Sequence, residues 1–303
     1  MKLLSWGSNA KGQLGFSDLD DVNHPKTVGE HDFMKILGGA NHVLMLDSSF
    51  QLWGVGDAQI FGSSCPFELT RLASDVADFA CGWTHSVTLS KNGNLNFHGK
   101  ITNKQRCFQD ETKVEHSSPD VVRVFSGPNA VFVLDTGHNL YQVIDGELFF
   151  VKDDVKEVAC GFAHILIWTL DDKLEVLGKH IKLPDSLANI LLIGSGWHHV
   201  VIVHQTLGTF QVTCAGRNTL GALGSSDRSS TQHTFNLDTR PVSLCVGSEY
   251  AMLLLEDGRL MTWGWNEHGN CGKKASEWEP PQVILENVAV IGCAYASSYA
   301  LVK

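Results

Sequence analysis

Histidines that recur at a fixed distance from a glycine are the residues of this chain best suited to chemistry. The pattern Gly-x-x-His occurs at residues 39–42, 82–85, 161–164 and 196–199. Imidazoles can bind metal ions or transfer protons, but a zinc site needs its ligands to converge on one ion at about 2.0–2.3 Å. These four histidines occupy one slot in four separate repeats. We therefore interpret them as structural groups that tie their loops by hydrogen bonds, and we expect no metal site.

The chain also lacks the short motifs of common enzyme classes. Neither His-Glu-x-x-His nor Gly-x-Ser-x-Gly occurs, and Gly272-Lys273-Lys274 lacks the frame of a phosphate-binding loop. These absences predict a protein that is not an enzyme and that has no cofactor.

The Gly-x-x-His segments belong to an internal repeat, and we call each copy of this segment a register and its first residue the register glycine. Degenerate copies begin at Gly127, Gly247 and Ala294, which makes seven registers in all. They lie roughly 35 to 50 residues apart, a period typical of stacked or ring-arranged units. About one hairpin after each register comes an aromatic or apolar residue followed by glycine, as in Trp53-Gly54 and Trp263-Gly264. Turn dipeptides such as Asp257-Gly258 separate the two elements and indicate tight hairpins.

The two ends of the chain hold complementary halves of one repeat. Residues 3–9 form a second element with no first element before it, and residues 288–301 form a first element with no second element after it. A ring in which Leu3 to Ser8 pairs with the C-terminal strands explains both halves. It also removes two exposed sheet edges.

Two linked motifs carry a family resemblance. Trp6-Gly-Ser-Asn-Ala-Lys-Gly-Gln-Leu-Gly15 and its relatives at 215–224 and 263–272, joined to the Gly-x-x-His registers, resemble the regulator of chromosome condensation repeat family. The resemblance implies an all-β fold, a seven-bladed β-propeller closed by pairing of the N- and C-terminal strands. Residues 1–303 are expected to form this propeller as a single domain.

Residues 263–272, followed by Gly292-Cys293-Ala294, are similar to a short branch of the family. Similarity to the fungal alpha-tubulin suppressor members of this branch implies that the chain is a non-catalytic protein–protein interaction module. The implied partner is a small metal-binding protein of diphthamide biosynthesis and of Elongator-dependent tRNA wobble uridine modification. The alternative, from secretion-regulating members, is a guanine nucleotide exchange factor or regulator of a small GTPase. Family members with that activity use an inserted wedge, for which the intervals between motifs leave no room.

Composition narrows the classes of partner. The net charge of −10 argues against binding to nucleic acid, which requires a positive surface. The eight cysteines are scattered singly, which indicates reduced thiols and a cytoplasmic or nuclear location. No apolar run reaches the length of a membrane span. We expect a monomer that forms a heterodimer with its partner.

The residue after each register glycine, which we call the register slot, suggests where that partner binds. Four of the seven are aromatic, namely Trp83, Phe162, Trp197 and Tyr295. Equivalent slots lie at one height on one face, so we expect a rim of aromatic rings that anchors a partner; alternatively, each ring packs over its own blade. A second group lies in and beside the 263–272 loop. The candidate partner-binding residues are Trp83, Trp197, His198, Glu249, Tyr250, Trp265, Glu267 and His268.

Overall fold

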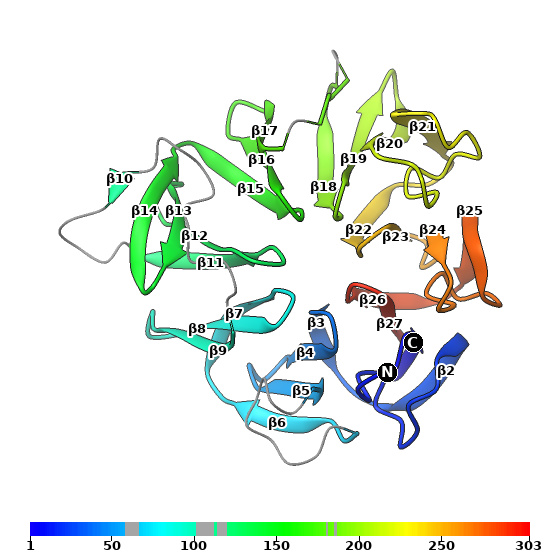
Figure 1. The fold of residues 1–303 in the computed structure, drawn as a ribbon, viewed down its shortest axis with the longest axis horizontal. Helices are drawn as coiled ribbons and strands as arrows, with labels where there is room; N and C mark the ends of the chain where they lie inside the picture. Colours follow the sequence, from blue (N-terminus) through cyan, green and yellow to red (C-terminus); the bar gives the residue numbers. More distant parts are fainter. Residues whose placement is uncertain (58–66, 101–111, 114–119, 180, 185–186) are drawn as a thin grey trace.

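A ring of antiparallel blades surrounds a central axis (Figure 1). The computed structural model describes residues 1–57, 67–100, 112–113, 120–179, 181–184 and 187–303. Within these residues the strands form seven blades, each of which begins with its innermost strand at the axis. The alternation of apolar residues between turn dipeptides, read from the sequence, produces these short strands.

The first four blades contain the following strands. Blade 1 consists of β3 (Phe33–Gly38), β4 (His42–Asp47), β5 (Leu52–Gly56) and β6 (Thr70–Ala73). Blade 2 consists of β7 (Val76–Cys81), β8 (His85–Ser90) and β9 (Leu95–Gly99). Blade 3 consists of β11 (Val121–Ser126), β12 (Val131–Asp135), β13 (Leu140–Ile144) and β14 (Glu147–Lys152), with β10 (Thr112–Lys113) at its outer edge. Blade 4 consists of β15 (Val155–Cys160), β16 (His164–Thr169) and β17 (Leu174–Gly178).

The remaining three blades complete the ring. Blade 5 consists of β18 (Ile190–Ser195), β19 (His199–Thr206), β20 (Thr209–Gly216) and β21 (Gln232–Leu237). Blade 6 consists of β22 (Pro241–Val246), β23 (Tyr250–Leu255), β24 (Leu260–Asn266) and β25 (Ser276–Leu285). Blade 7 combines β26 (Val288–Cys293) and β27 (Ser297–Val302) with β1 (Lys2–Gly7) and β2 (Val22–Glu30).

Blade 7 closes the ring by joining the two ends of the chain. β1 pairs with β27 along its whole length, from Lys2↔Val302 to Gly7↔Ser297, and its other edge pairs with β2. The Trp6 side chain is fully buried, and its Nε1 donates to the Asn270 carbonyl oxygen over 3.0 Å. This pairing confirms the closure that the complementary half-repeats predict.

Apolar side chains fill the spaces between neighbouring blades. Between blades 5 and 6, Val201 and Val203 of β19 pack with Ala251 and Leu253 of β23. Trp263 of β24 completes this contact and is fully buried. Each side chain of this kind contributes about 1.5–3 kcal/mol when it leaves water. The blades therefore act as a stiff frame for the loops at their ends.

The register glycines are required by the histidines that follow them. A Cβ atom on Gly161 would overlap the ring of His164 and would lie 2.7 Å from the carbonyl oxygen of Gly196 in the next blade. The same overlap with the following histidine ring occurs at Gly39, Gly82 and Gly196. The spacing Gly-x-x-His thus lets an imidazole lie flat over the backbone at each seam.

We expect Gly161→Ala to lower the free energy of unfolding by several kcal/mol, because neither the ring nor the backbone can move aside without breaking a seam. Urea unfolding followed by tryptophan fluorescence measures the loss. Gly93→Ala is the control: its Cβ would meet nothing within 4 Å. Its positive φ should cost only about 1 kcal/mol. Equal losses in the two variants would contradict the steric explanation.

The structure corrects one assignment of the repeat. In blades 2, 4, 5 and 6 the second-element glycine pairs with the residue that begins the second strand, as in His85↔Gly99. In blade 1 the residue paired with His42 is Gly56, which has a φ of +105°. The expectation of Gly54 for this slot is wrong by two residues, because both glycines follow apolar residues in Leu52–Gly56.

No helix among the described residues is long and apolar enough to cross a membrane.

Candidate functional site

The four aromatic residues of the register slot gather at the end of the central axis. The Trp83 ring lies 5.2 Å from that of Trp197 and 5.1 Å from that of Tyr295. Phe162 lies 6.1 Å from Trp197, and Trp197 lies 6.1 Å from Tyr295. We call these residues the aromatic cluster. The rings contact one another across the axis, which corrects the alternative expectation that each ring packs only over its own blade, whereas use of the rings as a partner anchor stays a prediction.

Part of the aromatic cluster faces solvent. Trp83 is 37% exposed and Phe162 is 47% exposed, whereas Trp197 and Tyr295 are half-buried beneath them. The Trp197 Nε1 atom is buried and has no hydrogen-bond partner among the described residues. Large rings that are supported from below and accessible from above suit an interface anchor.

Backbone hydrogen bonds between blades fix the height of the register slot. In blades 1, 2, 4, 5 and 6 the amide of the slot residue donates to the slot carbonyl of the next blade, as in Trp83 to Pro128 (3.0 Å) and Trp197 to Ser248 (2.8 Å). Tyr295 closes the circle by donating to the Gly39 carbonyl oxygen. Pro128 has no amide hydrogen and cannot donate to blade 4. The ring of amides therefore has one gap, at the seam between blades 3 and 4.

The register histidines link neighbouring blades rather than their own loops. Three of the four share a hydrogen bond with a serine hydroxyl of the next blade. The pairs are His42–Ser86 (2.7 Å), His85–Ser126 (2.9 Å) and His164–Ser195 (2.8 Å). Burial lowers the pKa of His42 to about 3 and those of His85 and His164 to about 4. These imidazoles are neutral near pH 7, which supports a structural role.

Blade 5 departs from this pattern at the seam with blade 6. His199 is fully buried, and both of its ring nitrogens lack a hydrogen bond among the described residues. Its Nδ1 lies 3.9 Å from Oε2 of Glu249, whose other oxygen accepts from Nη2 of Arg217 over 2.8 Å. Burial raises the pKa of the Glu249 carboxyl, while Arg217 opposes that rise. Burial also lowers the pKa of His199 to about 3.

The predicted residues around this seam fall into two groups. His198 is half-buried, and its ring lies edge-on to Phe162 at 6.0 Å, beside the aromatic cluster. Glu249 is only 2% exposed, so it reaches the surface through Arg217. Tyr250 is wholly buried and its hydroxyl donates to the Ser297 carbonyl oxygen over 2.7 Å. The prediction of Tyr250 as a partner contact is therefore wrong, because it takes the histidine slot of blade 6 and links it to blade 7.

The 263–272 loop forms a separate feature. The ring of Trp265 contacts that of His268 edge-on at 5.0 Å, and Nδ1 of His268 lies 2.6 Å from Oδ2 of Asp21 in the loop after β1. Trp265 is half-buried and Glu267 is exposed. The loop thus joins blade 6 to blade 7, and a contact of these three residues with a partner stays a prediction.

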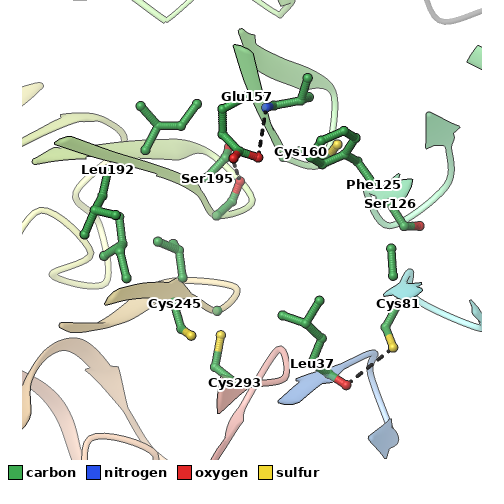
Figure 2. A pocket seen from close by; sticks show the side chains of 18 of the residues that line it. Leu37, Cys81, Phe125, Ser126, Glu157, Cys160, Leu192, Ser195, Cys245 and Cys293 are labelled. Carbon is green, nitrogen blue, oxygen red and sulfur yellow. Dashed lines mark hydrogen bonds between the residues drawn. The ribbon is translucent and has the colours of Figure 1, made fainter. Parts of the chain in front are cut away.

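A cavity of about 430 Å³ lies on the axis (Figure 2). It is lined by the innermost strands and is bordered by Trp197 and Tyr295 of the aromatic cluster. Four cysteines line it, namely Cys81, Cys160, Cys245 and Cys293. Burial raises the pKa of Cys81 to about 12, and that of Cys293 is also raised, with the hydrogen bond to Cys245 as its main cause. The thiols of Cys81 and Cys293 are therefore protonated near pH 7, which makes these two poor nucleophiles and metal ligands.

One charged slot of the innermost strands was missed by the sequence analysis. The residue four places before the register glycine is Lys35, Asp78, Arg123 and Glu157 in blades 1 to 4. Lys35 pairs with Asp78 over 2.5 Å, and Arg123 pairs with Glu157 over 2.6 Å. The alternation of sign at one repeat position is the signal that could have revealed these links.

Metal coordination is not suggested by the described part of the chain. Within it, no group of three or more His, Cys, Asp or Glu side chains is arranged to hold an ion. Cys65 and Cys107 lie outside the described residues. The repeat-equivalent histidines are separated, as expected, because each belongs to a different seam.

Comparison with known families identifies the repeat. Models of the regulator of chromosome condensation (RCC1) repeat match residues 2–46 and 242–270. An RCC1 repeat-containing protein of Schizosaccharomyces pombe is 23% identical, with 99% of each chain covered. The secretion-regulating guanine nucleotide exchange factor of Bos taurus is 24% identical over 99% of this chain and 82% of its own length.

Solved structures share the architecture. Prp20p from Saccharomyces cerevisiae, described with its binding to Gsp1p and histones, superposes with a TM-score of 0.80 at 18% identity, covering 99% of this chain and 90% of that one. Human WBSCR16 gives a TM-score of 0.80 at 15% identity, with both chains covered completely. The chain therefore has an RCC1-like β-propeller fold, and it matches the RCC1 repeat at residues 2–46 and 242–270.

Proposed function

We propose that this chain is a non-catalytic protein-interaction module that binds its partner over the aromatic cluster. The observation that carries the proposal is the exposure of Trp83 and Phe162 at the centre of one face, above a stiff frame. The lowered pKa of His164, the raised pKa of Cys81 and the Arg123–Glu157 and Arg217–Glu249 pairs support a binding role over a catalytic one.

The proposed partner is the small metal-binding protein of diphthamide biosynthesis and Elongator-dependent tRNA modification. This assignment rests on the similarity of residues 263–272 to the fungal alpha-tubulin suppressor branch. The proposed location is the cytoplasm, the nucleus or both. Size-exclusion chromatography of the two purified proteins at micromolar concentration tests the assignment. A co-eluting heterodimer supports it, and independent elution overturns it.

Truncation of Trp83 tests the surface itself. If Trp83 anchors the partner, Trp83→Ala should cost about 2 kcal/mol or more of binding, which is roughly a thirty-fold loss of affinity. Isothermal titration calorimetry gives the affinity and differential scanning calorimetry gives the stability. Phe97→Ala is the matched control, because Phe97 is 41% exposed on the outermost strand of the same blade. Should Trp83→Ala lower the melting temperature while affinity stays constant, Trp83 is only a packing residue.

A second candidate function is regulation of a small GTPase. It is favoured by the similarity to secretion-regulating guanine nucleotide exchange factors, which extends over 99% of this chain. A fluorescent-nucleotide release assay on a panel of secretory GTPases distinguishes the two functions. Accelerated release at catalytic amounts of the propeller would favour exchange, whereas unchanged release leaves the interaction module as the proposal.

A further inference from the structure

A second position of the repeat carries a lysine or arginine in the three blades that have a Trp or Phe in the register slot. We call the residue directly after the second-element glycine the second slot. Its backbone amide donates to the carbonyl oxygen of the residue that lies two places after the register glycine of the same blade. In blades 2, 4 and 5 this residue is Lys100, Lys179 and Arg217. Their acceptors are the carbonyl oxygens of Thr84, Ala163 and His198, with N···O distances of 2.9, 2.7 and 2.9 Å. Each acceptor directly follows a ring of the aromatic cluster.

Blades 1, 6 and 7, which have no Trp or Phe in the register slot, carry no cation in the second slot. Blade 1 has Ala40 with Asp57, and blade 7 has Tyr295 with Ser8. Blade 6 has Ser248 with Trp265. The cations thus accompany the Trp and Phe rings of the register slot rather than every copy of the repeat, on a chain whose net charge is −10.

Two of the three cations have no partner within the described part of the chain. Lys100 and Lys179 are exposed, and neither lies within 4.0 Å of a described carboxylate oxygen. Arg217 is 47% exposed and pairs with the buried Glu249. Lys179 and Arg217 both act electrostatically on His198 beside Phe162, which places their charges next to the rings.

Because cations and aromatic rings occur together in the same three blades, we infer that the face that carries the aromatic cluster binds an acidic protein segment. A large apolar side chain of the segment rests on Trp83 and Phe162, and flanking carboxylates meet Lys100 and Lys179. Anchors of this type supply affinity, and complementary charges at the rim supply orientation and association rate. The inference rests on the proposed function and adds the chemistry of the partner to it.

A nucleic acid is the less favoured occupant. Bases stack on free aromatic faces, but the rings here are tilted against one another by 37° to 58° and cover part of each other's surfaces. Three cations on a strongly acidic protein also give little of the positive field that a phosphate backbone requires.

The test compares two variants that carry the same change in charge. K100E/K179E reverses the two exposed cations beside Trp83 and Phe162, whereas K2E/K303E reverses two exposed lysines at the end of blade 7. Lys2 pairs with Val302 at the end of β1 opposite Gly7, so the second variant changes the far face. The probes are the candidate partner protein, a fluorescein-labelled peptide Glu-Glu-Phe-Leu-Glu-Glu, its lysine-for-glutamate counterpart, and oligouridylate. Fluorescence anisotropy and calorimetry at 50 and 300 mM salt give the affinities.

We expect the wild-type protein to bind the acidic peptide and not the basic one. Affinity should fall at least ten-fold in K100E/K179E, stay within two-fold in K2E/K303E, and weaken at 300 mM salt. The inference is overturned if both variants bind alike, if the wild type does not bind the acidic peptide at 50 mM salt, or if oligouridylate binds more tightly than the peptide. If the peptide binds as expected and the candidate partner does not, the partner assignment fails and the inference stands. If that partner binds both variants equally, the interaction module stands and the inference fails.

Discussion

Removal of residues 1–8 is expected to abolish cooperative unfolding of the propeller. The deletion takes away β1, which pairs with β27 on one side and with β2 on the other. It also removes Leu3 and Trp6, which are 1% and 0% exposed. Loss of a buried tryptophan side chain alone costs about 3–5 kcal/mol, and two sheet edges are opened as well.

Thermal unfolding followed by circular dichroism and calorimetry measures this effect. Trp6→Ala is the companion variant, because it removes the largest side chain while β1 stays in place. We expect Trp6→Ala to melt cooperatively at a lower temperature and the deletion to melt without a cooperative transition. A deletion variant that melts cooperatively at the parent temperature would show that β1 does not close the ring.

Acidification below pH 6.5 is expected to destabilise the fold before most carboxylates titrate. The buried register histidines have pKa values of about 3 (His42 and His199) and about 4 (His85 and His164), against 6.5 in the unfolded chain. Above pH 6.5 both states are neutral and stability does not depend on these groups. Below pH 6.5 these histidines bind protons in the unfolded state but stay neutral in the folded state, so the free energy of unfolding falls.

The size of this effect follows from linkage. Each histidine lowers the free energy of unfolding by about 1.4 kcal/mol per pH unit once pH is well below 6.5, or roughly 2 kcal/mol at pH 5. Urea unfolding between pH 7.5 and 5 measures the slope, and His164→Gln should reduce it by about a quarter. A free energy of unfolding that stays constant over this range would rule out burial of four neutral imidazoles.

The ring and its closure could be predicted from the sequence because they depend on repeated local features. The glycines, turn dipeptides and half-repeats each fix backbone geometry over a few residues. The error at Gly54 shows the limit of this method. Two glycines in Leu52–Gly56 fit the motif equally well, and only pairing with His42 selects Gly56.

The candidate surface could be predicted only in part. The sequence places Trp83 and Trp197 at one height, but their contact at 5.2 Å depends on the diameter of the closed ring and on rotamers. Tyr250 was misassigned because the sequence does not show that the histidine slot points into a seam. The cations at Lys100, Lys179 and Arg217 were missed because their relation to the rings appears only once strands are paired.

The gap that Pro128 leaves in the ring of amides makes one seam chemically different from the other six. At the seam between blades 3 and 4 the slot amide is missing, although the Val155 amide still donates to the His138 carbonyl oxygen and apolar side chains still pack between the blades. The remaining polar side-chain link on the innermost strands is the partly exposed Arg123–Glu157 pair, whose side chains are 42% and 30% exposed. Mobile ions screen such a pair, whereas they leave amide hydrogen bonds almost unaffected. Concentrated salt is therefore expected to weaken this seam more than a seam that keeps both its ion pair and its slot amide, such as the seam between blades 1 and 2.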